Sequence, residues 1–173
     1  MKCYIRKSNY KDLDNIYNLH INCFNINDQW YKSIIGQYIN NGIIIEIDNN
    51  QIIGILLQGD ITPCSNSEKN DFIPINDKGI EFYNNLDHIK NQYGIVMLCV
   101  DNNFRNKGIA TKLINTFLNL NKDKLLCLNT RKSNYYAFNL YKKIGFEYIA
   151  HIKNKYFLPD EDSIFMIYNN FNY

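Results

Sequence analysis

The chain has 173 residues, of which 46% are hydrophobic and 21% are charged, and this is the composition of an ordinary globular protein. Its net charge of +2 is too small to indicate nucleic acid or an anionic membrane as a partner. No apolar run approaches the roughly 18 residues that a membrane-spanning helix needs, so we expect no membrane association.

The N-terminal part predicts a strand followed by two helices. The strand covers 3–7, and Ser8 or Asn9 then caps a helix whose apolar stripe reaches Phe24. The second helix is expected over 28–38. This stretch therefore predicts helices that cover the beginning of a sheet.

The next 50 residues predict a hairpin and then an insertion. Two runs rich in β-branched residues are joined by Asn49-Asn50, which indicates a β-hairpin over 43–48 and 51–57. Residues 61–92 interrupt the regular order, although a helix is expected within 77–90. A segment of this length cannot bury a core alone, so we interpret 61–92 as an insertion within a single domain that spans 1–173.

The C-terminal half alternates strands and helices before it closes with two strands. The predicted strands are 94–100, 125–130, 146–153 and 164–171, and the predicted helices are 108–120 and 133–143. This order predicts an α/β (α+β) fold with a single central mixed β-sheet flanked by helices and with the insertion between the third and fourth strands.

The turn between 94–100 and 108–120 is the most informative segment for function. A buried strand leads into the basic loop around Arg105 and Lys107, and an amphipathic helix follows. Backbone N–H groups and the positive end of a helix meet at such a turn, and Gly108 permits a backbone conformation that other residues avoid. The segment therefore predicts a site for a diphosphate group.

Cysteines and histidines indicate neither disulfides nor a metal. The five cysteines are odd in number, form no Cys-x-x-Cys pair and lie mostly in apolar runs, which favours a reducing, cytoplasmic location. The N-terminus does not have the pattern of a signal peptide. His20, His88 and His151 are too far apart for a metal-ligand motif, and His20 on its apolar stripe is expected to be a core residue.

Two sequence blocks resemble the GNAT acetyltransferase superfamily. The segment Arg105-Asn106-Lys107-Gly108-Ile109-Ala110 matches the family's acyl-CoA loop, Arg/Gln-x-x-Gly-x-Gly/Ala. The segment 134–146 is similar to the family's Asn-x-x-Ala-x-x-x-Tyr-x-x-x-Gly-Phe block. The resemblance covers nearly the whole chain outside 61–92 and implies an acyltransferase that uses acetyl-CoA.

The resemblance also implies roles for individual residues. Tyr141 matches the tyrosine that protonates the departing CoA thiolate, and Asn134 matches a side chain that contacts the cofactor or caps its helix. The family pairs the pantetheine arm with strand backbone, here at Leu98 and Val100, where unpaired groups are expected. The implied pyrophosphate site comprises Arg105, Asn106, Lys107, Gly108, Ile109, Ala110 and Thr111.

Shorter motifs resemble the NatE- and NatF-type protein N-terminal acetyltransferases. The segment 24–34 is similar to their loop and second helix, although Asn25 replaces a proline, and 153–157 is similar to their tyrosine-bearing loop. The resemblance implies that Phe24 and Tyr156 contact the substrate N-terminus.

The residue that acts as the general base in these relatives has no counterpart in this chain. They place a His or a Glu where this chain has Asn129, and a Tyr where it has Gly94, with Tyr93 one residue away. Asn129 cannot take a proton, although it can position a water. A base could also come from the insertion, where Asp60, Tyr83 and His88 are candidates.

Three functions remain open. The first is acetyl transfer to a protein or peptide N-terminal α-amine. The second is acetylation of a small amine, such as a polyamine or an aminoglycoside-like molecule, held by acidic residues around the insertion: Asp60, Glu68, Asp71, Asp77, Glu81 and Asp87. The third is a catalytically weak CoA-binding module, and the oligomeric state is open in all three.

Overall fold

The structure is a computed structural model that describes residues 2–47, 50–61, 71–85, 92–157 and 159–168. The chain divides into two compact units, which we call the first unit (Met1–Gly59 and Ile95–Asn121) and the second unit (Asp60–Gly94 and Lys122–Tyr173). The prediction of a single domain with an insertion over 61–92 stays a prediction.

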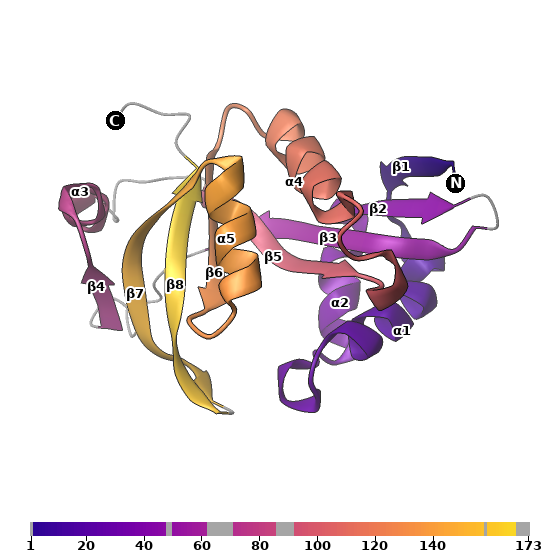
Figure 1. Cartoon of the computed structure of the whole chain (residues 1–173), viewed down its shortest axis with the longest axis horizontal. Helices are drawn as coiled ribbons and strands as arrows, with labels where there is room; N and C mark the ends of the chain where they lie inside the picture. The colour runs from indigo at the N-terminus through magenta and orange to yellow at the C-terminus, as the bar shows by residue number, and fades with distance from the viewer. Residues whose placement is uncertain (1, 48–49, 62–70, 86–91, 158, 169–173) are drawn as a thin grey trace. The chain divides into compact units, whose positions relative to one another are not determined.

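The first unit is a strand layer with helices on both faces (Figure 1). Its strands follow the order β1-β2-β3-β5, and β2 pairs antiparallel with both β1 and β3, which confirms the predicted hairpin pairing. Its elements are β1 (Cys3–Lys7), β2 (Gly42–Ile47), β3 (Ile52–Asp60), most of β5 (Gln92–Val100), α1 (Leu13–Cys23), α2 (Lys32–Tyr38) and α4 (Ile109–Leu120).

The two faces of these strands are covered differently. Alternate residues of β2, β3 and β5 pack against α1 and α2 in a core that includes Ile16, Ile35, Ile44 and Met97. On the other face α4 approaches closely, because a Cβ atom at Gly54 would lie 2.9 Å from Cγ2 of Ile109. The start of α4 is therefore fixed directly against β3.

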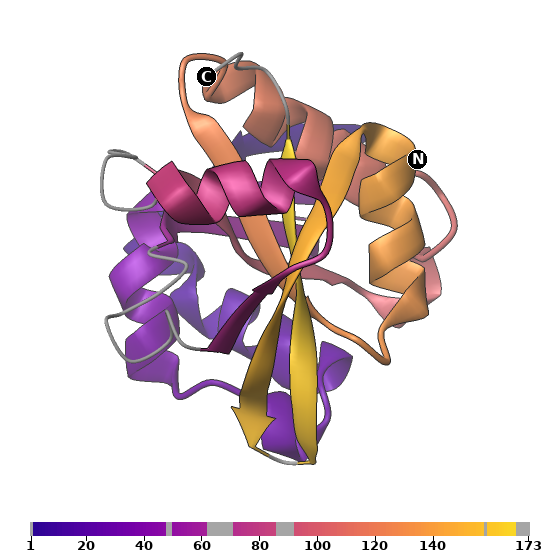
Figure 2. The ribbon, with the colours of Figure 1, turned by 90° about the vertical axis from the view of Figure 1, so that its left-hand side faces the viewer.

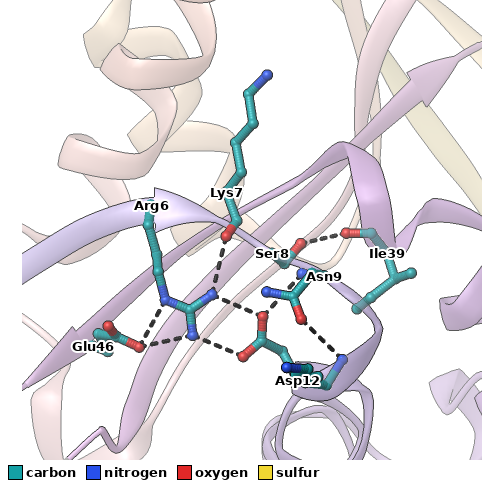
Figure 3. A network of polar contacts seen from close by, with 8 residues as sticks. Arg6, Lys7, Ser8, Asn9, Asp12, Ile39 and Glu46 are labelled. Atoms are coloured by element: carbon teal, nitrogen blue, oxygen red, sulfur yellow. Dashed lines mark hydrogen bonds and ion pairs between the residues drawn. The ribbon is translucent and has the colours of Figure 1, made fainter.

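A polar network ties β1 to the beginning of α1 and to β2 (Figure 3). The Arg6 guanidinium donates to both carboxylate oxygens of Asp12, at 2.8 and 2.7 Å, and its Nε donates to Glu46 at 3.0 Å. Asp12 also accepts from the backbone N–H of Asn9, whose side chain caps the turn that opens α1. The sequence predicted the cap, whereas the ion pairs of Arg6 can be recognised only in the three-dimensional structure.

The second unit is an antiparallel strand layer in the order β6-β8-β7-β4. It also contains a helix on either side of that layer (Figure 2). Its elements are β4 (Phe72–Pro74), β6 (Leu125–Arg131), β7 (Phe146–Phe157), β8 (Asp160–Tyr168), α3 (Asp77–Asn85) and α5 (Tyr135–Ile144).

The side chains of β8 alternate between these two helices. Phe165 belongs to the aromatic core under α3, where its ring lies 5.3 Å from that of Phe82. Tyr168 faces the other way and contacts Phe146, which packs against Tyr141 of α5. The twofold period of the strand thus separates a core under α3 from the face that carries α5.

The described part of the segment 61–92 supplies residues to this second core. Both β4 and α3 lie within 61–92, and β4 pairs with β7 between Phe72 and Ile152. A Cβ atom at Gly79 of α3 would lie only 2.2 Å from the carbonyl oxygen of Ile149. The helix therefore rests directly on the backbone of β7. Leu86 and Ile89, which the sequence assigns to the same helix face, lie outside the described residues.

The second helix begins later than the sequence predicts. The structure has a 3-10 turn at Ile26–Asp28, and α2 starts only at Lys32. Gln29 and Tyr31 are extended, with ψ angles of 130° and 145°, so they cannot continue the turn into a helix. Hydrogen bonds from the end of α1 hold the loop in this shape, and no local periodicity reports them.

Candidate functional site

The basic loop of the first unit adopts the backbone shape of an anion-binding turn. Asn106 and Gly108 both have positive φ angles, of 60° and 76°, and Gly108 directly precedes α4. At the start of α4 the N–H of Lys112 donates to the carbonyl of Gly108 at 3.0 Å, and no side chain caps the helix. Left-handed residues ahead of an uncapped helix end turn backbone N–H groups toward a site that an anion can occupy.

Gly108 is required here by conformation and not by crowding. A Cβ atom at this position would meet no atom within 4 Å, yet the φ angle of 76° is one that side-chain-bearing residues rarely adopt. The loop thus leaves open space above its N–H groups, which is what a bound diphosphate requires.

The loop side chains are exposed and arranged by local contacts. Arg105 Nε donates to the carbonyl of Val100 at 3.3 Å, and Lys107 Nζ donates to the carbonyl of Asn103 at 3.0 Å. Lys107 also lies 5.1 Å from the ring centre of Phe104. The structure brings the predicted pyrophosphate residues together in one turn, and their binding of a cofactor stays a prediction.

The strand that leads into the loop has one half-buried and one buried face. Leu98 and Val100 are half-buried, and Cys99 between them is buried. The expectation of unpaired backbone at Val100 is wrong for its carbonyl, which accepts from Arg105 Nε and from the Cys23 thiol, both at 3.3 Å. The assignment of Leu98 to the cofactor stays a prediction.

In the second unit, α5 positions the other predicted cofactor and catalytic residues. Asn134 caps α5, because its Oδ1 accepts from the N–H of Ala137 at 3.1 Å, so only the amide nitrogen remains for a contact with a cofactor. Tyr141 lies on the inner face of α5, 6% exposed, with its ring 5.7 Å from that of Phe146. The helix therefore fixes the tyrosine ring by packing.

Asn129 of β6 is oriented by a buried serine. Its Oδ1 accepts from the hydroxyl of Ser163 at 3.1 Å, and Ser163 is fully buried on β8. The amide group consequently presents N–H donors. It can hold a water through the oxygen of that water, and it has no site that takes up a proton at neutral pH.

Tyr93 and Gly94 do not supply the missing base. A Cβ atom at Gly94 would lie 2.2 Å from the carbonyl oxygen of Cys127, which leaves no room for a larger residue. Burial, and then the charge of Asp60, raise the pKa of Tyr93, whose ring lies 3.6 Å from Lys124 Nζ. A phenol with a raised pKa is a poorer base at neutral pH.

The candidate bases in and beside the segment 61–92 are not seen to come together in one site among the described residues. Tyr83 stacks on Phe72 with ring centres 5.8 Å apart, and this places it in the aromatic packing beneath α3. Asp60 is exposed at the end of β3. His88 lies outside the described residues.

The structure adds a candidate that the sequence did not reveal, the Tyr148–His151 pair of β7. The Tyr148 hydroxyl lies 2.8 Å from Nδ1 of His151 and its ring packs edge-on against Phe138 of α5. Residues three apart point to opposite faces of a regular strand, but a bulge between Tyr148 and Ala150 brings both side chains together. Burial, and then the charge of Lys132, lower the pKa of His151 and keep its ring neutral.

The loop between α1 and α2 is held from the end of α1. The backbone N–H of Trp30 donates to Nε2 of His20 at 2.7 Å, and Gln29 Nε2 donates to the carbonyls of Ile21 and Phe24, both at 3.0 Å. Phe24 turns inward and packs 4.8 Å from the His20 ring. The outward side chains of this segment are instead Ile26 and Tyr31, 79% and 80% exposed.

Tyr156 belongs to a polar group at the far end of β7. The Arg131 guanidinium lies 4.2 Å from the ring centre of Tyr156 and forms a 3.2 Å ion pair with Glu161. The Ser133 hydroxyl also donates to Glu161, at 3.0 Å. Tyr156 is half-buried, so part of its surface is available to a ligand.

The described part of the chain shows neither a membrane-spanning helix nor a cluster of metal-binding side chains. Among those residues, no helix combines the length and the apolarity that crossing a bilayer would take. In the same residues, no cluster of three or more His, Cys, Asp or Glu side chains is arranged to hold a metal ion.

A family model matches the middle part of the chain. Residues 69–148 match the family model described as an acetyltransferase (GNAT) domain, and this range includes the basic loop and the α5 block. No curated protein sequence matches the chain. The sequence resemblance to GNAT proteins is thus supported by the family model.

Solved structures support the same fold at low sequence identity. NAA60 from Arabidopsis thaliana, in complex with acetyl-CoA, is 19% identical with a TM-score of 0.73, covering 96% of this chain and 99% of that one. The ribosomal-protein-S18-alanine N-acetyltransferase from Escherichia coli is 14% identical with a TM-score of 0.72, covering 96% and 92%.

A third similar structure belongs to a protein that is named for a different role. The loading GNATL domain of CurA from Lyngbya majuscula is 13% identical with a TM-score of 0.76, covering 98% of both chains. Such varied neighbours show that the fold alone does not select the acceptor. Residues 69–148 therefore match a GNAT acetyltransferase domain, and the chain has the mixed α/β fold of the similar structures, in which an open multi-stranded sheet is flanked by helices.

Proposed function

We propose that the protein transfers an acetyl group from acetyl-CoA to the α-amine of a peptide or protein N-terminus. The observation that carries this proposal is Asn129, which stands at the position of the family's base and whose Oδ1 already accepts from Ser163. The amide cannot deprotonate an amine, so the acceptor must supply a substantial neutral fraction by itself.

The pKa of the acceptor decides between amine classes. An α-amine with a pKa of about 7.7–8.0 is neutral in roughly one molecule in seven at pH 7, whereas a lysine amine near 10.4 is neutral in about four in ten thousand. The difference in deprotonation cost is about 3.5 kcal/mol at about 1.36 kcal/mol per pKa unit. Without a strong base, the α-amine is the acceptor that can react.

The cofactor-binding part of the proposal rests on the first unit. The residues present fit a diphosphate, because positive φ angles at Asn106 and Gly108 precede an uncapped helix end beside Arg105 and Lys107. Acetyl-CoA supplies the activated thioester, and the N–H groups of 106–111 and these two cations hold its phosphates.

The proton steps are assigned to the second unit. Tyr141 is the donor to the departing thiolate, as its place in the 134–146 block implies, since a phenol near pKa 10 can protonate a thiolate near 8.5. Asn129 positions a water that receives the proton of the amine, and the neutral His151 is the second candidate for that step.

The substrate assignment rests on two loops. The segment from Phe24 to Tyr31 is held by His20 and Gln29 and exposes apolar side chains, which suits contact with an extended peptide. Tyr156 has a partly exposed ring beside Arg131. Among the similar structures is the ribosomal-protein-S18-alanine N-acetyltransferase from Escherichia coli, whose name states a protein acceptor.

The test measures CoA-thiol release from acetyl-CoA with three acceptors: peptides with free N-termini, the same peptides blocked at the N-terminus but carrying lysine, and spermidine. Release with free N-termini alone is expected. Release with spermidine alone would establish the small-amine function, and acetyl-CoA binding without release to any acceptor would indicate a module with weak chemistry.

A pair of variants tests the peptide site. Tyr156→Ala is expected to raise the KM for the peptide several-fold while leaving acetyl-CoA affinity unchanged. Tyr156→Phe is the matched control, because it keeps the ring beneath the Arg131 guanidinium. Equal peptide KM values in the wild type and Tyr156→Ala would remove Tyr156 from the substrate site.

A further inference from the structure

Two cysteines and an arginine meet where β5 ends in the first unit. The Cys23 thiol at the end of α1 donates to the carbonyl of Val100 at 3.3 Å, and Arg105 Nε donates to the same oxygen at the same distance. Cys99, the residue before Val100, is buried in the core cluster against which Cys23 packs. Two cysteines that are 76 residues apart in sequence thus meet at the end of β5.

The two sulfur atoms have opposite environments. Cys23 is partly exposed, whereas Cys99 is buried. The neighbouring Cys99 thiol, and then the Arg105 guanidinium, lower the pKa of Cys23 to about 7, against burial and the charge of Asp101. Burial and the neighbouring Cys23 raise the pKa of Cys99 well above its ordinary value. Cys23 is therefore partly exposed and loses its proton more readily than an ordinary thiol, whereas Cys99 is buried and keeps its proton.

We propose that Cys23 and Cys99 form a peroxide-reactive dithiol site, in which a hydroperoxide oxidises Cys23 and Cys99 resolves the product to a disulfide. A partly exposed thiol of low pKa beside a cation, with a second thiol nearby, is the arrangement that such oxidation requires. The acetyl-transfer reaction makes no use of either sulfur, so this chemistry is additional to it.

The steps balance with the peroxide as the only oxidant. The Cys23 thiolate attacks a peroxide oxygen, an S–O bond forms, and the O–O bond breaks with loss of hydroxide or an alkoxide. The Cys99 sulfur then attacks the Cys23 sulfenic acid, the S–O bond breaks, and the oxygen leaves as water with the proton of Cys99. The two sulfurs are oxidised by two electrons in total, and the peroxide is reduced.

The experiment uses the full chain carrying Cys64→Ser, which leaves the four cysteines that the structure describes. The reduced protein is treated with hydrogen peroxide, quenched by alkylation and mapped by mass spectrometry without reduction. A single linkage between Cys23 and Cys99 is expected. Cys3→Ser, which removes the other partly exposed thiol, is the matched control and should leave that linkage intact.

Two further variants separate the roles of the sulfurs. Cys99→Ser should leave Cys23 as a sulfenic acid that dimedone traps, and Cys23→Ser should leave Cys99 reduced. Oxidation of Cys3 at the same rate as Cys23, or oxidation of Cys23 to a sulfinic acid without a linkage in the parent chain, would overturn the proposal.

The pH dependence of alkylation provides an independent measurement. The rate of Cys23 alkylation in the folded protein should show a midpoint near pH 7, well below the value of about 8.5 for an ordinary thiol. Arg105→Gln should move the midpoint upward, and denaturation in urea should abolish the difference from Cys3. A midpoint unaffected by both changes would overturn the assignment of Cys23 as the reactive thiol.

Discussion

The imidazole Nε2 of His20 accepts a hydrogen bond from the backbone N–H of Trp30 at 2.7 Å. His20 is 1% exposed, and among the described residues its Nδ1 is buried without a hydrogen-bond partner. Because Nε2 is the acceptor, the neutral ring carries its proton on Nδ1. One buried side chain thus fixes the start of the segment that leads into α2.

Replacing His20 should loosen this loop. His20→Leu leaves the Trp30 N–H without its acceptor and should lower the free energy of unfolding by about 1–3 kcal/mol. His20→Gln, which can still accept through its amide oxygen, should lose less. Urea unfolding measures both variants, and a stability loss in His20→Gln equal to that of His20→Leu would show that the hydrogen bond is not the cause.

The same contact predicts a loss of stability in acid. Burial lowers the pKa of His20, so the unfolded chain takes up the proton at a higher pH than the folded one. The free energy of unfolding should therefore be constant well above the unfolded value near 6.5 and fall as the pH drops below it. Unfolding at pH 7.5 and 5.5 tests this, and His20→Gln should reduce the slope. The pKa of His151 is lowered too, so His151→Gln is measured in parallel.

Substitutions at Gly108 can distinguish the effect of backbone conformation from the effect of crowding at the cofactor loop. Gly108→Ala places a Cβ in open space but requires a left-handed residue, at a cost of about 1–2 kcal/mol. If the loop must adopt this left-handed conformation in order to bind acetyl-CoA, the affinity for acetyl-CoA should fall by roughly 5- to 30-fold. Gly108→Asn is the matched control and should lose less, because asparagine tolerates this conformation. Calorimetric titration with CoA measures both, and equal losses would point to crowding by the side chain.

The Arg6 network predicts a stabilising role for one aspartate and not for another. Asp12 is nearly buried and receives charged hydrogen bonds from Arg6 that lower its pKa, so Asp12→Asn should destabilise the protein by about 1.5–3 kcal/mol. Asp14 pairs with Lys32 at the surface, where its side chain is 77% exposed, so Asp14→Asn should change stability by less than about 1 kcal/mol. Because the pKa of Asp12 is lowered, its contribution is present at neutral pH and is lost in strong acid. Guanidine unfolding of the two variants compares them directly.

Tyr141→Phe should reduce kcat by roughly 100- to 10,000-fold, because it removes the proton donor to the thiolate. The ring can keep its packing against Phe146, so the thermal midpoint checks that the variant is folded. An unchanged kcat would falsify the role of Tyr141 as the acid.

The sequence predicted what depends on local pattern. The apolar run of β5, the basic loop and the Gly108 start of α4 follow from hydrophobic period and glycine placement, and the structure has them where expected. The contacts that distinguish this chain depend on residues far apart: Cys23 with Val100, and Asn129 with Ser163. No single-sequence pattern reports such pairs.

Backbone irregularities explain the remaining differences. The bulge in β7 places Tyr148 beside His151, although their spacing in a regular strand would separate them. The short strand β4 has only three residues and includes Pro74, so it carried no strand signal, and its pairing with β7 came from the sheet edge. In each case a tertiary contact set the local geometry.

Gly79 gives α3 a constraint of a different kind from its hydrophobic residues. Many apolar side chains can replace one another in the aromatic core, but at Gly79 any side chain would collide with the backbone of Ile149. Position 79 should therefore tolerate no substitution while the surrounding apolar positions drift during evolution. Distant relatives that share this helix should be recognisable by that one small residue, even where the pattern of hydrophobic residues no longer aligns.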